Sequence, residues 1–169
     1  MKVKLKKLHE DAKLPYKAKD GDFCYDVYAV SETEVAPNVW RYGLGFAYEI
    51  VRDYVTIVED NSGSVKFNGL EIDLSKSPLN IDIDFRPRSS VWKTGMVLSN
   101  CEGSLDEFYR GEAMAVYYHV FPQMERYHVG DRIGQIKLGI TIPLEFEWAD
   151  EINMDTERGK GGFGSTGKN

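Results

Sequence analysis

The chain has 169 residues, of which 42% are hydrophobic and 28% charged, and its formal net charge at pH 7 is −6. This length suits one domain with a sizeable core and is short for two. The acidic balance argues against a nucleic-acid partner, because contacts to phosphate dominate such affinity. No apolar run approaches the length that a membrane span requires, so we expect no membrane partner either.

Two cysteines, Cys24 and Cys101, are too few for a disulfide framework or a cysteine-based metal site. The basic residues 1–8 are followed by no long apolar run, so we expect no secretory signal. We therefore expect reduced cysteines and a cytoplasmic protein, located in the host cytoplasm if the source is a virus.

Many short segments rich in β-forming residues, separated by turn signals, predict an all-β barrel or sandwich. The expected strands are a lysine-rich strand over 3–8, then 23–30, 39–50 with a bend at glycines 43 and 45, a hairpin within 65–74 around Asn68-Gly69, and finally 79–85, 133–138 and 140–147. In 140–147 apolar and polar residues alternate strictly, and Pro143 favours an edge position. One helical turn is expected near Ser89–Lys93.

The segment Ser99–Glu112 lies between two apolar runs and holds glycines at 103 and 111. This pattern predicts a β-hairpin or a tight arch with a polar tip. Asp106 and Tyr109 on such a tip can face one pocket, where the carboxylate could activate a water and the ring could stack on a flat ligand. The alternative is that both side chains only satisfy local backbone groups.

Two further stretches leave alternatives open. Asp26 lies in the middle of an expected strand, so it must find a partner or face a cavity. The stretch Arg158–Asn169 holds five glycines in twelve residues. It is either a frayed tail or a lid that closes over an anion and a base, since glycine allows close approach to phosphate and hinge freedom.

In this order, the pieces resemble the trimeric dUTP pyrophosphatase (dUTPase) family along nearly the whole chain. The five motifs that carry the resemblance are Phe23-Cys-Tyr-Asp-Val27, Arg88-Ser-Ser-Val-Trp-Lys-Thr-Gly95, Gly103-Ser-Leu-Asp-Glu-Phe-Tyr-Arg-Gly-Glu112, Gly130-Asp-Arg-Ile-Gly-Gln135 and Arg158-Gly-Lys-Gly-Gly-Phe-Gly-Ser-Thr-Gly167. The resemblance implies a jelly-roll-like β domain over 1–157, a flexible C-terminal lid over 158–169, and a homotrimer with active sites between subunits. It also implies hydrolysis of dUTP to dUMP and pyrophosphate with Mg²⁺.

The resemblance further implies a role for each matching residue. Asp106 would be the general base that activates the attacking water, and Tyr109 would pack on the deoxyribose and exclude UTP. Uracil would be recognised by Asn100, Gly103, Ser104 and Leu105; the phosphates would be bound by Arg88, Ser89, Ser90 and Gln135; the lid would contribute Arg158, Phe163, Gly164, Ser165 and Thr166. Asp26 would reach Mg²⁺ through water, or would only pair with a strand neighbour. Histidines 9, 119 and 128 show no metal-ligand spacing.

The chain departs from the family pattern in three places. Phe23-Cys24 stands where small residues are usual, Ser90 replaces a commoner glycine, and residues 51–79 resemble an insertion. The insertion is either a decorated loop or a surface for a protein partner. Two other functions remain open: a dCTP deaminase-like enzyme of the same superfamily, and a non-catalytic regulatory protein on the dUTPase scaffold.

Overall fold

The computed structural model describes residues 2–51, 64–67, 70–73, 80–141, 144–153 and 155–156. Its elements are β1 (Lys2–Lys7), β2 (Tyr25–Tyr28), β3 (Ser31–Ala36), β4 (Val39–Gly43), β5 (Phe46–Val51), β6 (Ser64–Phe67), β7 (Leu70–Asp73), β8 (Asn80–Arg86), the 3₁₀ helix η1 (Ser89–Thr94), β9 (Met96–Leu98), β10 (Gly103–Leu105), β11 (Met114–His119) and β12 (Arg132–Thr141). The predicted all-β class is confirmed.

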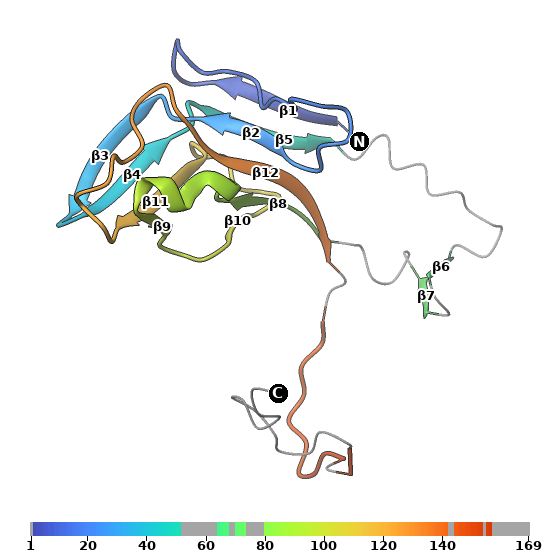
Figure 1. Ribbon diagram of the computed structural model, residues 1–169. Helices are drawn as coiled ribbons and strands as arrows, with labels where there is room; N and C mark the ends of the chain where they lie inside the picture. Colours follow the sequence, from blue (N-terminus) through green and yellow to red (C-terminus); the bar gives the residue numbers. More distant parts are fainter. Residues whose placement is uncertain are drawn as a thin grey trace.

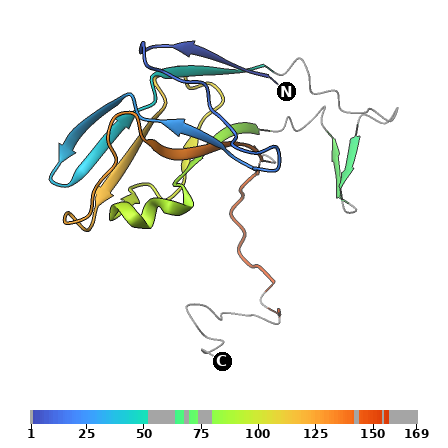
Figure 2. The same ribbon diagram turned by 45° about the horizontal axis from the view of Figure 1, so that its top comes forward.

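Two four-stranded antiparallel sheets form the body of the protein (Figures 1 and 2). The strand orders are β10-β8-β12-β2 in one sheet and β3-β4-β11-β9 in the other. Strands β1 and β5 make a separate two-stranded ribbon, and among the described strands β6 pairs with β7 alone. The order within each sheet joins strands that are distant in the sequence, which is the pattern of a jelly-roll-like sandwich.

A group of interlocking aromatic rings fills the space between the sheets. Tyr117 of β11 meets Phe85 of β8 edge to face, with 6.4 Å between the ring centroids. It also meets Tyr42 at 6.1 Å and Tyr127 at 5.6 Å. Tyr42, Phe85 and Tyr117 are fully buried. The contact between Tyr117 and Phe85 crosses from one sheet to the other, so it helps to fix how the two layers align.

The predicted strand over 39–50 is divided in two by its glycines. β4 ends at Gly43 and β5 begins at Phe46, and the two belong to different sheets. Gly45 between them has φ +73°, a left-handed conformation that side chains disfavour. At the predicted bend the chain therefore leaves the sheet that contains β4 and joins the ribbon of β1 and β5.

The segment Ser99–Glu112 is an arch and not a hairpin. β9 before the turn pairs with β11, whereas β10 after it pairs with β8 in the other sheet. The turn between them thus spans the two layers. The hairpin alternative was wrong because each strand finds its partner elsewhere in the chain.

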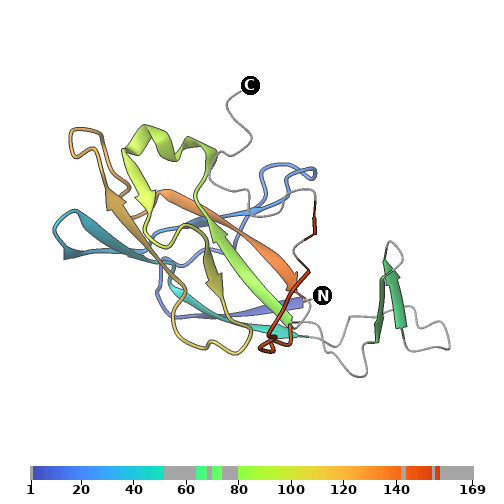
Figure 3. The same cartoon turned by 90° about the horizontal axis from the view of Figure 1, so that it is seen from below.

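The other strand predictions have mixed outcomes. β6 and β7 pair antiparallel, which confirms the inserted hairpin, although Asn68 and Gly69 lie outside the described residues. The strand over 140–147 was wrong beyond Thr141, because residues 144–147 are irregular (Figure 3). Leu144, Phe146 and Trp148 are exposed, so the alternating pattern has no partner surface within the described part of this protomer. Among the described residues, no helix is long and apolar enough to cross a membrane.

Candidate active site

A buried carboxylate accepts hydrogen bonds from three side chains, two on one strand and one on a loop. Asp26 of β2 is 6% exposed. Its Oδ1 accepts hydrogen bonds from Arg88 Nε at 3.2 Å and Gln135 Nε2 at 3.1 Å, and its Oδ2 accepts one from Arg132 Nη1 at 3.0 Å. Buried charges need such partners. In this protomer Asp26 is therefore paired with neighbouring side chains.

Strand register explains this gathering. Gln135 of β12 lies directly opposite Asp26 of β2, so both side chains project from the same face of the sheet. The register shifts between Arg132 and Gly134, where one extra residue is accommodated. Such a bulge redirects the strand locally, and here Arg132 also reaches the Asp26 carboxylate.

Arg88 stands where the chain enters η1. Its backbone is extended, with φ −72° and ψ 155°, and the predicted helical turn begins at the next residue. Ser89 is exposed and Ser90 is partly buried. The motif thus combines a guanidinium held by Asp26 with the hydroxyl groups of the next two residues in the chain, which is donor chemistry suited to phosphate.

The predicted uracil-binding residues meet in the arch. A Cβ built on Gly103 would lie 3.3 Å from Asn100 Nδ2, so this side chain closes directly over the start of β10. β10 pairs with β8 and forms the outer strand of its sheet. One edge of this strand therefore presents backbone N–H and C=O groups that can pair with the polar edge of a base.

Asp106 and Tyr109 follow β10 in a tight loop. Tyr109 N–H donates to the Asp106 main-chain oxygen at 3.0 Å, and the Tyr109 hydroxyl donates to the Glu112 main-chain oxygen at 3.0 Å. The ring is 38% exposed, and the Asp106 side chain is also exposed. One protomer thus presents both groups at its surface, where a ligand or another chain could cover them.

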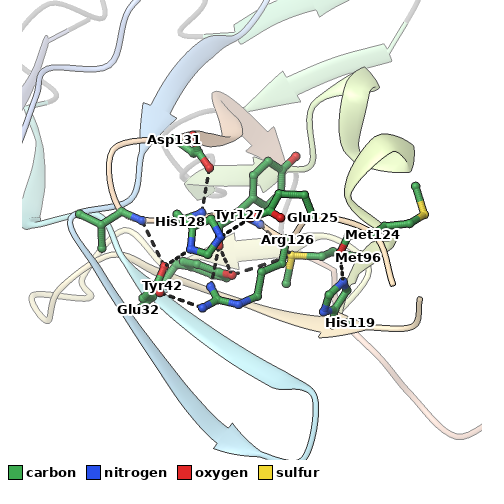
Figure 4. A network of polar contacts seen from close by, with 11 residues as sticks. Glu32, Tyr42, Met96, His119, Met124, Glu125, Arg126, Tyr127, His128 and Asp131 are labelled. Carbon is green, nitrogen blue, oxygen red and sulfur yellow. Dashed lines mark hydrogen bonds and ion pairs between the residues drawn. The ribbon is translucent and has the colours of Figure 1, made fainter. Parts of the chain in front are cut away.

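A polar network fixes the connection from β11 to β12 (Figure 4). Arg126 Nη2 donates to Glu32 Oε1 of β3 at 2.9 Å, and its guanidinium lies 3.6 Å from the Trp40 ring centroid. His128 Nε2 lies 2.6 Å from Glu125 Oε1. This loop leads directly into Arg132 and Gln135, so the network helps to set where β12 begins.

The carboxylates near the site bear on whether Mg²⁺ could bind there. Within the described residues, no group of three or more His, Cys, Asp or Glu side chains is arranged to hold a metal ion. Within the described part of the chain Asp26 Oδ2 accepts one hydrogen bond, and a carboxylate oxygen has room for a second from a metal-bound water. Mg²⁺ keeps several waters and binds substrate phosphates, so a single carboxylate acting through water fits its chemistry.

The structure therefore brings together some predicted residues and says nothing of others. Asp26, Arg88 and Gln135 meet at one point, and Asn100 meets Gly103 in the arch. The lid residues Arg158, Phe163, Gly164, Ser165 and Thr166 lie outside the described residues. Arg132 was not among the predicted site residues. Its position in the fourth motif, three residues before Gln135, could have indicated that it lies near Asp26.

Comparison with solved structures shows which known fold the chain shares. No protein-family model matches the chain. A mutant dUTPase of Staphylococcus bacteriophage 80alpha, solved with dUpNHpp, superposes with a TM-score of 0.67 and 19% identity over 98% of both chains. A mutant dUTPase of the S. aureus phage phi11, described as revealing the coordination of a structural Mg(II) ion, gives 0.61 and 14% over 90% of this chain and 99% of that one. The chain has the dUTPase fold.

Sequence similarity agrees with the fold. Deoxyuridine 5'-triphosphate nucleotidohydrolase of Nautilia profundicola is 29% identical over 171 residues, which cover 99% of this chain and all of the relative. The protein of the same name from Helicobacter pylori is 29% identical over 168 residues, covering 99% of this chain and 97% of that one. The resemblance to dUTPases is thereby confirmed in sequence and in fold.

Proposed function

We propose that this protein is a dUTP pyrophosphatase that hydrolyses dUTP to dUMP and pyrophosphate. The observation that carries the proposal is similarity over 99% of the chain to relatives named dUTP nucleotidohydrolases. The site geometry supports it, because the described part of the chain supplies both a phosphate-binding cluster and a polar arch suited to a base.

The phosphate end of the site is built around Arg88. Attack of water on the α-phosphorus requires negative charge on the triphosphate to be neutralised and the leaving pyrophosphate to be held in line. Arg88, Ser89, Ser90 and Gln135 supply these donors. Mg²⁺, when bound to the phosphates, would neutralise further charge, with Asp26 accepting from a water of its shell.

The base end of the site is built from the arch. Asn100 and the free edge of Gly103–Leu105 would pair with uracil, whose carbonyl oxygens and N3–H match backbone donors and acceptors. Cytosine presents the opposite pattern at that edge, which would leave buried groups unpaired at a cost of about 1–3 kcal/mol each. Tyr109 would pack on the deoxyribose and exclude a 2′-hydroxyl.

Asp106 is the proposed general base. Its side chain is exposed in the protomer, so a neighbouring subunit and the C-terminal lid would complete the enclosure around it. We therefore propose a homotrimer in which Arg158, Phe163, Gly164, Ser165 and Thr166 close the site. Excluding water there would strengthen every charge interaction with the substrate.

Two peripheral proposals accompany this function. The protein would act in the cytoplasm, with both cysteines reduced. The hairpin β6–β7 of the insertion pairs with no other described strand, which leaves it available to a protein partner.

The direct test incubates the protein with each deoxynucleoside triphosphate and Mg²⁺. We expect pyrophosphate from dUTP alone and a solution mass near three times 19.2 kDa. Ammonia release from dCTP would instead indicate a deaminase. The absence of any product would indicate a non-catalytic protein on this scaffold.

A further inference from the structure

A buried phenol lies behind the loop that carries Asp106. Tyr48 of β5 is 2% exposed, and its hydroxyl donates a hydrogen bond to the Asp106 main-chain oxygen. The same oxygen accepts the Tyr109 N–H at 3.0 Å. One carbonyl group therefore ties the proposed general base and the proposed sugar-contacting residue to a residue of the core.

The far end of this loop is fastened to the same part of the chain. Glu112 Oε1 accepts a hydrogen bond from Gly45 N–H at 2.9 Å. Ala113 N–H donates to Phe46 O at 2.9 Å, and Leu44 N–H donates to Ala113 O at 2.9 Å. The segment 106–113 thus spans two anchors on residues 44–48, with Tyr48 at the Asp106 end.

We infer that Tyr48 is a positioning residue that sets the orientation of Asp106 and Tyr109 together; this inference rests on the proposed function. Holding the peptide group after Asp106 fixes the direction in which its side chain leaves the backbone. A misplacement of about 1 Å can cost about 100-fold in rate, so a loop that carries a base needs such an anchor.

The surroundings of the phenol suit this role. Burial, followed by the nearby charge of Asp106, raises the pKa of Tyr48 to about 12. The hydroxyl therefore remains a proton donor at every pH at which the enzyme would work. Tyr48→Phe removes the hydroxyl that donates to the Asp106 main-chain oxygen. That oxygen still accepts the hydrogen bond from Tyr109 N–H, so the variant tests the anchor without leaving the oxygen unpaired.

The test compares Tyr48→Phe with Tyr42→Phe. Tyr42 is an equally buried tyrosine whose hydroxyl donates to a main-chain oxygen, that of Tyr127, at 2.9 Å. Both variants lose one buried hydrogen bond from a phenol to a main-chain carbonyl. Only Tyr48→Phe changes the anchor of the catalytic loop, so a purely structural role would make the two variants alike.

We expect Tyr48→Phe to lower kcat for dUTP about tenfold with KM changed less than threefold, since a small displacement of the base slows the chemical step. The ratio of kcat/KM for dUTP to that for UTP should also fall. Hydrogen exchange at the Tyr109 amide should accelerate in Tyr48→Phe and not in Tyr42→Phe.

Two outcomes would overturn the inference: kinetics of Tyr48→Phe that match those of Tyr42→Phe, or an unchanged exchange rate at the Tyr109 amide. If the wild-type protein fails to hydrolyse dUTP, the proposed function fails. The exchange measurement still decides whether Tyr48 holds the loop.

Discussion

Gln135 and Asp26 face each other across the pairing of β12 with β2, and the Gln135 amide donates to the Asp26 carboxylate at 3.1 Å. Arg88 shares the same carboxylate oxygen. Two groups that would bind substrate phosphate are thus held by one buried anion before any substrate arrives. Asp26 therefore positions Arg88 and Gln135, two of the side chains proposed to bind phosphate.

Asp26→Asn should therefore weaken substrate binding. Removing the charge loosens Arg88 and Arg132, and we expect KM for dUTP to rise about tenfold, because a charge-assisted hydrogen bond contributes about 1.5–3 kcal/mol. The Mg²⁺ concentration for half-maximal activity should rise as well. Asp22→Asn is the control, because Asp22 is a partly buried loop carboxylate of the same charge that bonds only to a nearby main-chain N–H, that of Lys19, among the described residues. A KM equal to that of the control would contradict the role of Asp26.

Asp106→Asn should fold and assemble normally but hydrolyse dUTP about 10²–10⁴ times more slowly, the range that general-base catalysis contributes. The side chain is exposed, so its replacement leaves the core intact. Steady-state pyrophosphate release and solution mass are the measurements. Turnover near the wild-type rate would exclude Asp106 as the base.

Removal of residues 158–169 should preserve assembly and reduce kcat/KM for dUTP by more than about 100-fold, since the phosphate and base would lose their proposed cover. Removal of residues 167–169 alone keeps Arg158–Thr166 and is the matched control. Equal activity of the two truncated proteins would rule out the lid.

Glu32 gives the protein a pH-dependent contribution to stability. The hydrogen bond from Arg126 lowers the pKa of the Glu32 carboxyl below its ordinary value. This stabilisation is complete above the unfolded-state pKa and is lost as the pH falls through the folded-state pKa.

Glu32→Gln should accordingly lower the free energy of unfolding by about 2 kcal/mol at pH 7, the scale of a hydrogen bond to a charged group. The difference from wild type should shrink as the pH falls below about 4, where the unfolded state takes up a proton, and vanish below the lowered folded-state pKa, where both states are protonated. Glu49→Gln breaks the exposed pair with Lys4 and should cost much less. Denaturant titrations across pH would check this, and a pH-independent difference would contradict it.

Two neighbouring carboxylates on β8 should respond oppositely to substitution. Burial, followed by the charge of Asp84, raises the pKa of Asp82. Among the described residues, Asp82 Oδ1 is buried without a hydrogen-bond partner. Asp84 instead pairs with Lys137, whose Nζ lies 2.6 Å from Oδ2.

Asp82→Asn should raise the free energy of unfolding at pH 7 by about 1 kcal/mol, the low end of the cost of an unsatisfied buried group. Because the folded-state pKa is raised, the cost of the charged wild-type carboxylate is present above the folded-state pKa and vanishes below the unfolded-state pKa. The gain should therefore disappear in acid. Asp84→Asn should destabilise, and a loss of stability in both variants would refute this account.

Local sequence patterns predicted the strands whose apolar side chains are buried within the protomer. The alternation over 79–85 correctly predicted β8, because its apolar residues Ile81, Ile83 and Phe85 are buried in the core of the same protomer. The same alternation wrongly predicted a strand over 144–147. Periodicity shows which side chains favour burial, but it does not show which part of the chain they pack against. Asp84 is also more buried than a half-exposed strand suggests, because Lys137 reaches it from β12.

The site could be predicted only as far as motif resemblance extended. Asp26 draws its partners from 62, 106 and 109 positions away in the chain, so no spacing rule could pair them. Tyr48 belongs to none of the five motifs, and its contact with Asp106 arises because β5 is hydrogen-bonded to the segment that follows β10. Such contacts depend on how the sheets pack, which the sequence shows only indirectly.

The full exposure of Trp148, beyond the end of β12, gives the protein an optical reporter. An indole in water emits at longer wavelengths than one against apolar side chains. Any neighbour that covers the stretch after β12 would shift this emission toward the blue, so a dilution series would reveal assembly without an added label.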